Sequence, residues 1–304
     1  MTDTPETPTR SGFVALIGAP NAGKSTLVNQ LVGAKVSIVT HKVQTTRALV
    51  RGIATVDNTQ IVLMDTPGVF APKRRLDRAM VTTAWSGARD ADIVLVLIDA
   101  RKGVREDEER IIEMLPSIKL PKWLILNKVD TVEPPKLLEL AKVLNERADF
   151  AETFMISALG GSGCKDLLNK IAATVPEGPW YYPEDQISDL PMRQLAAEIT
   201  REKLYLRLHQ ELPYSSTVET ESWEEKKDGS VKIQQVGYVE RDSQKKIVLG
   251  RKGETIKAIG QAARKEIAEI LEQPVHLFLF VKVRENWGND PERYREMGLD
   301  FSGD

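Results

Sequence analysis

The nine residues Gly18 to Thr26 have the spacing that binding of phosphate groups requires. They read GAPNAGKST, with four residues between the two glycines and a lysine directly after the second. Such a turn points backbone N–H groups at phosphate oxygens, and the helix that follows adds its partial positive charge. The pattern predicts that Lys24 reaches the β- and γ-phosphates of a nucleoside triphosphate and that the Ser25 hydroxyl binds Mg²⁺. The other predicted nucleotide contacts in this loop are Asn21, Ala22, Gly23 and Thr26.

A second short motif, DTPG at residues 65–68, follows the apolar run Ile61 to Met64. An aspartate where a strand ends can hold a water of the Mg²⁺ shell. Gly68 lets its backbone N–H approach the γ-phosphate, because no side chain stands in the way. We therefore expect Lys24, Asp65 and Gly68 to take part in catalysis. Thr66 and Pro67, which lie between Asp65 and Gly68, are expected to contact the nucleotide as well.

The polar segment Lys35 to Arg47 lies between these two motifs. A threonine hydroxyl that joins the Mg²⁺ shell only while the γ-phosphate is present makes such a segment sensitive to hydrolysis. We favour Thr46 over Thr45 for this position because Thr46 directly precedes Arg47, and Thr45 stays the alternative. The predicted metal ligands are thus Ser25, Thr46 and Asp65.

A base-reading motif, NKVD at residues 127–130, follows the apolar run Trp123 to Leu126. The Asp130 carboxylate can accept hydrogen bonds from the ring N–H and the exocyclic amine of guanine, a pair that adenine lacks. GTP and GDP are therefore the predicted ligands. Asn127 is expected to brace the base and the phosphate loop, while the aliphatic stem of Lys128 covers the purine face. Backbone N–H groups facing the guanine carbonyl oxygen are expected from Ser157 and Ala158.

Val69 follows Gly68, where many switch GTPases carry the glutamine that orients the attacking water. A valine cannot do this, so unassisted hydrolysis is expected to be slow, at about 10⁻⁴ to 10⁻² s⁻¹. Two sources of assistance stay open. One is an outside partner, and the other is K⁺ held near the phosphate loop by Asn21.

The pattern around these motifs predicts an α/β domain over residues 11–178, after a loose tail at 1–10. Apolar runs alternate there with helical patterns, as in a mainly parallel sheet, and Asp57-Asn58 predicts a hairpin within it. The single cysteine, Cys164, cannot form an intramolecular disulfide. Because the chain also has no apolar stretch of membrane-spanning length and no signal peptide, a cytoplasmic location is expected.

The composition changes near the sequence GPWYYP at residues 178–183, and residues 179–190 read as a semi-rigid linker. Residues 191–304 then predict the order α-β-β-α-α-β, which is that of a small RNA-binding fold. The net charge of the whole chain is −2, so contact with nucleic acid has to come from a local patch. Tyr238 and Phe280 are candidate rings for stacking on bases, but aromatic residues on strands are expected in the core.

Such a patch surrounds the G-x-x-G loop Gly250 to Gly253. Between Arg241 and Lys265 there are eight basic and two acidic residues. Paired glycines let an oligonucleotide backbone approach, and about four nucleotides are held in grooves of this type. The alternative is a simple helix-entry turn. The predicted RNA contacts are Gly250, Arg251, Lys252, Gly253, Lys245, Lys246 and Lys257.

With Gln44 to Arg47 and the run Val281 to Trp287, the motifs above resemble in type and order those of the bacterial Era family of GTPases, within the TrmE-Era-EngA group. The resemblance covers about residues 11–300. It implies a Ras-like P-loop domain with a mixed, mainly parallel sheet, followed by an α+β type II KH domain at 191–304.

The resemblance also implies a function. Members of the family bind GTP and GDP with Mg²⁺ and assist assembly of the small ribosomal subunit. By resemblance the G-x-x-G groove binds single-stranded RNA near the 3′ end of 16S rRNA, RNA accelerates hydrolysis, and DNA is not a partner. Peripheral association with the inner face of the cell membrane is implied too, although no basic amphipathic helix in the sequence supports it.

Two other functions stay open. One is an RNA-tethering module of the ribosome in which GTP is mainly structural, as Val69 suggests. The other is a tRNA-modification or translation GTPase, which is the weaker because the sequence has no evident modification domain or barrel modules.

Overall fold

A computed structural model describes residues 8–209 and 212–301, which form two compact units. The described part of the first unit comprises residues 8–37, 46–189 and 297–301, and that of the second comprises 38–45, 190–209 and 212–296. The domain boundaries expected from the sequence stay predictions. Within the described ranges, no helix has the length and apolar character needed to cross a membrane.

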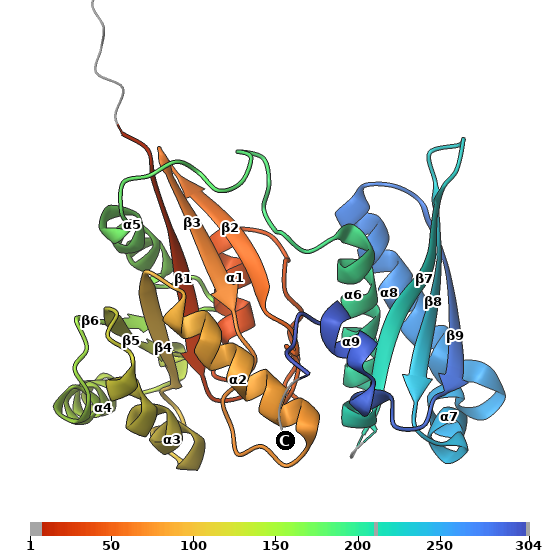
Figure 1. The fold of residues 1–304 in the computed structure, drawn as a ribbon, viewed down its shortest axis with the longest axis horizontal. Helices are drawn as coiled ribbons and strands as arrows, with labels where there is room; N and C mark the ends of the chain where they lie inside the picture. The colour runs from red at the N-terminus through yellow and green to blue at the C-terminus, as the bar shows by residue number, and fades with distance from the viewer. Residues whose placement is uncertain (1–7, 210–211, 302–304) are drawn as a thin grey trace, which may run out of the picture. The chain divides into compact units, whose positions relative to one another are not determined.

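The first unit is built on a six-stranded sheet with the order β2-β3-β1-β4-β5-β6 (Figure 1). Only β2 and β3 pair antiparallel, which confirms the predicted hairpin at Asp57 in a mainly parallel sheet. The central strands β1 and β4 contain long apolar runs because both of their faces are covered. The strands are β1 (Arg10–Gly18), β2 (Val50–Val56), β3 (Thr59–Asp65), β4 (Ile93–Asp99), β5 (Lys122–Asn127) and β6 (Glu152–Ile156).

Helices cover both faces of this sheet (Figure 1). On one face Leu27 of α1 and Leu167 of α5 pack with Leu16 of β1. The opposite core contains Ile17 together with apolar residues of α2, α3 and α4. The helices are α1 (Lys24–Val32), α2 (Arg75–Arg89), α3 (Glu106–Met114), α4 (Pro134–Arg147) and α5 (Cys164–Thr174). Alternate residues of β1 thus face different cores, and the carboxyl ends of the strands are left to form the site.

Residues 179–189 run beside the β2–β3 hairpin. The Gln60 side chain, fully buried, accepts hydrogen bonds from the backbone N–H groups of Tyr181 and Tyr182 at 2.9 and 3.0 Å. The Ile53 N–H donates to the Ile187 carbonyl at 2.9 Å. These bonds hold the segment against the first unit, which explains how a stretch without helix or strand keeps a defined path.

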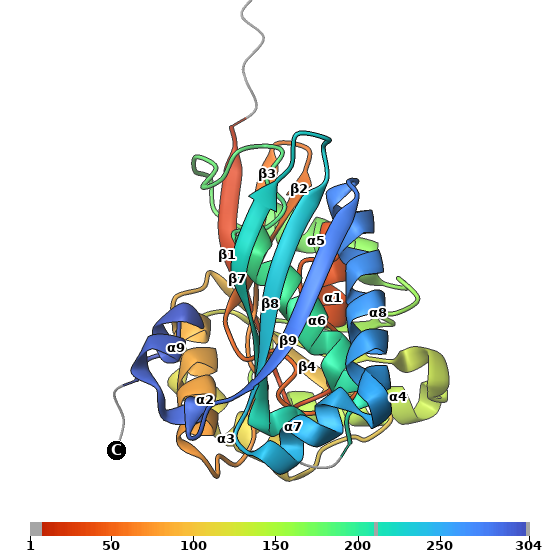
Figure 2. The ribbon, with the colours of Figure 1, turned by 90° about the vertical axis from the view of Figure 1, so that its right-hand side faces the viewer.

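The second unit has a three-stranded sheet with the order β7-β8-β9, antiparallel and then parallel. Helices α6 and α8 cover one face (Figure 2), where Leu204 and Ile259 pack with Val281. The order of elements confirms the predicted α-β-β-α-α-β pattern, and a short helix follows it. The elements are α6 (Met192–Arg207), β7 (Ser216–Glu225), β8 (Val231–Val239), α7 (Asp242–Leu249), α8 (Glu254–Leu271), β9 (Val275–Val283) and α9 (Pro291–Glu296).

Two aromatic residues of β9 do not lie in the core. Phe278 is 47% exposed and Phe280 49% exposed. Successive residues of a strand face opposite sides of its sheet, so these two rings share the face away from Val281. The expectation that Phe280 is a core residue is therefore wrong. Tyr238 is partly buried, with the Arg293 guanidinium 4.5 Å from its ring centroid.

The short segment 38–45 belongs to the second unit, although its sequence lies between two motifs of the first. The Val39 N–H donates to Glu202 Oε1 at 2.8 Å. The buried Arg201 donates to the Thr45 carbonyl. Lys42 Nζ donates to two carbonyls at the C-terminal end of α6, where a helix favours a cation. Helix α6 therefore holds the middle of the segment that separates the phosphate loop from Thr46.

Candidate functional site

The phosphate loop is the stretch Ala19–Gly23 between β1 and α1. Gly23 has φ +104°, and a Cβ at this position would lie 2.2 Å from Asn127 Nδ2. Gly18 is also constrained, because a Cβ there would lie 2.8 Å from the Leu97 carbonyl oxygen of β4. Both glycines of the motif are thus required by close packing, and the first turn of α1 starts directly at Lys24.

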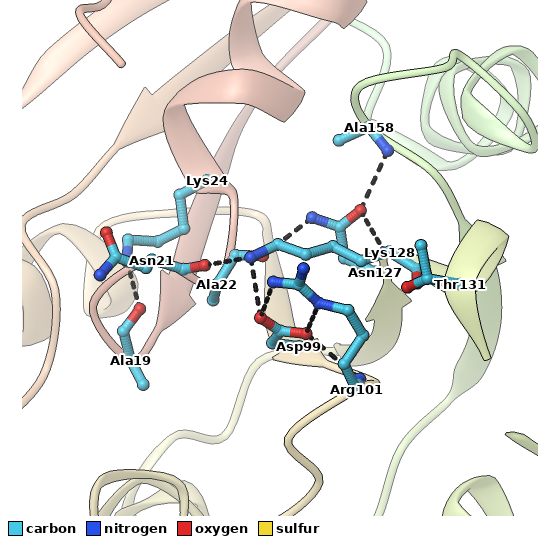
Figure 3. A network of polar contacts seen from close by, with 10 residues as sticks. All are labelled: Ala19, Asn21, Ala22, Lys24, Asp99, Arg101, Asn127, Lys128, Thr131 and Ala158. Carbon is cyan, nitrogen blue, oxygen red and sulfur yellow. Dashed lines mark hydrogen bonds and ion pairs between the residues drawn. The ribbon is translucent and has the colours of Figure 1, made fainter. Parts of the chain in front are cut away.

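Lys24 is buried within this loop. Its ammonium donates to the Gly18 carbonyl at 2.9 Å. It also donates to the Ala19 carbonyl at 3.2 Å (Figure 3). Burial lowers the pKa of Lys24 to about 8, and the charge of Asp65 opposes that shift. An ammonium held in this loop can donate charge-assisted hydrogen bonds to phosphate oxygens, which are stronger than hydrogen bonds between neutral groups. The predicted contact of Lys24 with the β- and γ-phosphates stays a prediction.

Ser25, Thr46 and Asp65 lie together at the end of β3. The hydroxyls of Ser25 and Thr46 are 2.9 Å apart, and Thr46 Oγ1 donates to Asp65 Oδ2 at 3.3 Å. The other carboxylate oxygen, Asp65 Oδ1, is buried and has no hydrogen-bond partner among the described residues. Mg²⁺ prefers oxygen ligands and keeps several waters, so two hydroxyls beside a carboxylate with an unused oxygen fit this ion.

Ser37 is a member of this cluster that the sequence reasoning missed. Its hydroxyl donates to Asp65 Oδ2 at 2.5 Å. Burial raises the pKa of Asp65 above its usual range, against hydrogen bonds from Ser25, Ser37 and Thr46 and the charge of Lys24, which lower it. No motif marks Ser37, and its position in the polar segment before Thr46 was the only available signal.

The DTPG motif packs directly against the phosphate loop. A Cβ at Gly68 would lie 3.0 Å from Pro20 Cγ and 3.1 Å from Pro20 N, so the two backbones approach closely. The Val69 N–H donates to the Gly18 carbonyl at 3.1 Å. The Val69 side chain is 3% exposed and belongs to the core beneath. Position 69 therefore presents no polar group toward a water at the γ-phosphate.

Asn127 joins three parts of the site. Its Nδ2 donates to the Ala22 carbonyl at 2.8 Å, and its Oδ1 accepts from the N–H groups of Ala158 at 3.0 Å and Lys128 at 2.8 Å (Figure 3). The side chain is 1% exposed. The predicted bracing of the phosphate loop is thus present in the geometry, and it also includes the exit of β6.

Lys128 and Asp130 differ in their surroundings. Lys128 has φ +66°, and its ammonium donates to the Asn21 carbonyl at 2.6 Å, so its stem runs over the phosphate loop. Asp130 is exposed, which leaves its carboxylate available to a base. The backbone N–H of Ser157 donates to the Ser162 carbonyl, and that of Ala158 to Asn127. Since both amides have acceptors within the protein, their expected contact with the guanine carbonyl oxygen stays a prediction.

The G-x-x-G loop of the second unit connects α7 to α8. Gly250 has φ +72°, and a Cβ there would lie 2.2 Å from Thr255 Oγ1. Gly253 has φ +81° and open space around its Cβ position. The basic side chains near the loop are exposed apart from the half-buried Lys245, and the exposed ones are Lys246, Arg251, Lys252 and Lys257. Two of these stand between the glycines, where a phosphate backbone would approach.

Comparison with known proteins agrees with both units. Residues 13–128 match the family described as 50S ribosome-binding GTPase, and residues 211–288 match the KH domain. A protein from Brucella suis biovar 1 (strain 1330), GTPase Era, is 77% identical over 299 residues, which span 98% of this chain and 96% of that protein. The chain belongs to the Era family of GTPases. Era from Mesorhizobium japonicum is also 77% identical, over 99% of this chain and 98% of its own.

Solved Era structures share this fold over both units. The crystal structure of Era in complex with MgGDPNP and nucleotides 1506–1542 of 16S ribosomal RNA has a TM-score of 0.91 and 38% identity. A variant of Aquifex aeolicus Era bound to GDP.AlF4⁻ also has a TM-score of 0.91, with 37% identity. Each covers 95% of this chain and 99% of the Era chain compared. The fold expected from the resemblance, a mainly parallel P-loop sheet followed by a KH domain, is confirmed.

Proposed function

We propose that this chain is a GTP-hydrolysing switch that binds 16S rRNA near its 3′ end and assists assembly and maturation of the small ribosomal subunit. The observation that carries the proposal is the presence in one chain of two sites of different chemistry. Asn127 ties the phosphate loop to the base-reading turn, and the G-x-x-G loop presents Arg251 and Lys252 to solvent. The Era relative with MgGDPNP and 16S rRNA nucleotides supports both ligands.

In the proposed nucleotide complex, Lys24 binds the β- and γ-phosphates and the Gly68 N–H binds the γ-phosphate. Mg²⁺ is held by Ser25, Thr46 and a water on Asp65, and it neutralises charge that develops on the phosphate oxygens. Asp130 reads guanine by accepting from its ring N–H and exocyclic amine. The remaining proposed contacts, which line the phosphates and the base, are Asn21, Ala22, Gly23, Thr26, Thr66, Pro67, Asn127, Lys128, Ser157 and Ala158.

Hydrolysis in this site is proposed to be slow without assistance. The buried Val69 offers no hydrogen bond to the attacking water. Bound RNA is the proposed accelerator, and K⁺ near the Asn21 side of the phosphate loop is a second source of positive charge. The protein is proposed to be cytoplasmic, with peripheral association at the inner face of the cell membrane.

RNA is proposed to lie against the G-x-x-G loop. The open space at Gly253 admits a phosphate backbone, and Arg251 and Lys252 supply charge beside it. The loop is flanked by three further basic residues that are proposed as phosphate contacts, Lys245, Lys246 and Lys257. An exposed basic loop in a chain with net charge −2 favours a local nucleic-acid site over general attraction to polyanions.

One experiment tests substrate, partner and accelerator together. Single-turnover GTP hydrolysis is measured with and without a small-subunit rRNA 3′ fragment, in K⁺ and in Na⁺ buffers of equal ionic strength. We expect slow turnover that RNA increases at least tenfold. A basal rate that neither RNA nor K⁺ changes would favour the tethering function, in which GTP is structural. Selective acceleration by tRNA would favour the tRNA-modification alternative.

A further inference from the structure

Asp99 is a buried acid at the nucleotide site to which the sequence assigned no role. It is the last residue of β4 and lies opposite Asn127 in the register of β4 and β5. Its side chain is 2% exposed. A buried carboxylate has to be paired with charges or hydrogen-bond donors, so the partners of Asp99 indicate what it does.

Lys128 is one of these partners. Its ammonium lies between Asp99 Oδ2 at 2.8 Å and the carbonyl oxygen of Asn21 at 2.6 Å (Figure 3). A Cβ built at Gly23 would lie 3.8 Å from Lys128 Cε, so the stem of the lysine passes beside the phosphate loop. Two anchors at the end of a flexible side chain fix the path of the methylene groups before any ligand arrives.

Arg101 is the second partner. It donates from Nε to Asp99 Oδ1 at 3.0 Å and from Nη2 to Asp99 Oδ2 at 2.8 Å, while its own side chain is 46% exposed. Burial would raise the pKa of Asp99, but hydrogen bonds and charges from Arg101 and Lys128 outweigh it and lower the pKa to about 2. Asp99 is thus a stable anion that can hold two cations at neutral pH.

We propose that Asp99 is a positioning residue for nucleotide binding. It holds the Lys128 ammonium against the Asn21 carbonyl, so that the aliphatic stem of Lys128 is fixed where the purine ring stacks. Arg101 supplies the second positive charge and covers the solvent side of the Asp99 carboxylate. The inference rests on the guanine-nucleotide site proposed above, and it adds the last residue of β4 to that site.

The test is the affinity of the full-length protein for a fluorescent GDP analogue after Asp99→Asn. Loss of a charge-assisted hydrogen bond predicts about tenfold weaker binding, through faster dissociation with little change in association. A double-mutant cycle with Lys128 distinguishes loss of the positioning of Lys128 from general damage to the fold. In a Lys128→Met background, which keeps the stem and removes the ammonium, Asp99→Asn is expected to weaken binding less than twofold further.

Asp92→Asn is the matched control. Asp92 Oδ2 accepts from the Phe13 N–H at 2.7 Å before the start of β4, so the same change is made away from the nucleotide. We expect its GDP affinity to stay within twofold of the unchanged protein. Asp99→Ser serves if Asp99→Asn fails to fold by circular dichroism. Unchanged GDP dissociation in the folded variant, or an equal loss in the Lys128→Met background, would overturn the proposal. Absence of binding by the unchanged protein would instead contradict the guanine-nucleotide site.

Discussion

Asn127 and Ala22 are 105 residues apart in the chain and are joined by a 2.8 Å hydrogen bond from Asn127 Nδ2 to the Ala22 carbonyl. The same side chain accepts from the N–H groups of Lys128 and Ala158. The buried side-chain amide of Asn127 therefore fixes the position of the phosphate loop relative to the NKVD motif. In the proposed nucleotide complex this spacing has to match the length of a nucleotide, so Asn127 is expected to link the stability of the fold to ligand binding.

Asn127→Ala is expected to lower the free energy of unfolding by about 2–4 kcal/mol, because it removes three hydrogen bonds of roughly 1 kcal/mol each and leaves buried groups without partners. GDP and GTP affinities are expected to fall at least tenfold. Urea unfolding and nucleotide titration measure the two effects. The control is Asn145→Ala, which removes a bond of 2.8 Å to the Ala141 carbonyl within α4 and the bonds between Asn145 and Thr153, away from the nucleotide site. Lower stability with unchanged nucleotide affinity would contradict the bracing role.

Asp130→Asn is expected to weaken GTP binding at least about 100-fold, because an amide cannot accept from both guanine donors and presents a donor of its own. Xanthosine nucleotides have a carbonyl where guanine has its amine, so their affinity is expected to rise. Competition titrations with both nucleotides measure the change. Asp149→Asn, at another exposed aspartate, is the control. Equal GTP affinity in both variants would remove Asp130 from the site.

Gly253→Asp is expected to weaken RNA binding about tenfold, because a carboxylate in the loop repels phosphates. GTP affinity is expected to change less than twofold. Gly229→Asp is the matched control, since Gly229 has φ +78° and open space at its Cβ position, against φ +81° at Gly253. Both variants therefore carry the same backbone strain. Filter binding with a 3′ fragment of 16S rRNA measures affinity, and equal losses in the two variants would place the RNA elsewhere.

Cys164 is expected to react slowly with iodoacetamide in the native protein. It is 4% exposed, and burial raises its pKa from 9.0 to about 11. The thiolate is the reactive form, so at pH 8 the raised pKa alone leaves about 100-fold less of it. Reaction is expected to speed up as pH rises toward 11 and to become fast in urea. Mass spectrometry of timed samples measures this, and fast native alkylation at pH 8 would show that the thiol is accessible.

The acid stability of the first unit should depend on Asp99. Its pKa in the folded protein is lowered from 3.8 to about 2. The ionised form therefore stabilises the fold above pH 4, and this contribution is lost as pH falls from 4 toward 2. The difference in unfolding free energy between the unchanged protein and Asp99→Asn should be constant from pH 5 to 8 and shrink below pH 4. Urea unfolding at each pH measures it, and a difference that keeps its full neutral-pH size down to pH 2 would contradict the ionised pair.

The sequence determined the local chemistry, because each motif consists of neighbours in the chain. Spacing alone placed the two glycines of the phosphate loop, Asp65 at a strand end and the order of elements in the second unit. It did not place Phe280, whose exposure depends on which face of β9 the helices cover. The two-residue period of a strand shows which residues share a face of the sheet. Only the packing of the helices decides which of the two faces is buried.

Contacts between distant segments had to come from the tertiary structure. Asp99 follows an apolar run visible in the sequence, but only the register of β4 against β5 brings it to Lys128. Ser37 joins the cluster of Ser25, Thr46 and Asp65 through its bond to Asp65. Segment 38–45 is bonded to α6, which the chain reaches only after the whole first sheet. Strand register and helix docking are set by the summed packing of many residues. The sequence thus predicted which groups bind phosphate, guanine and RNA, and the fold decided which residues hold those groups in place.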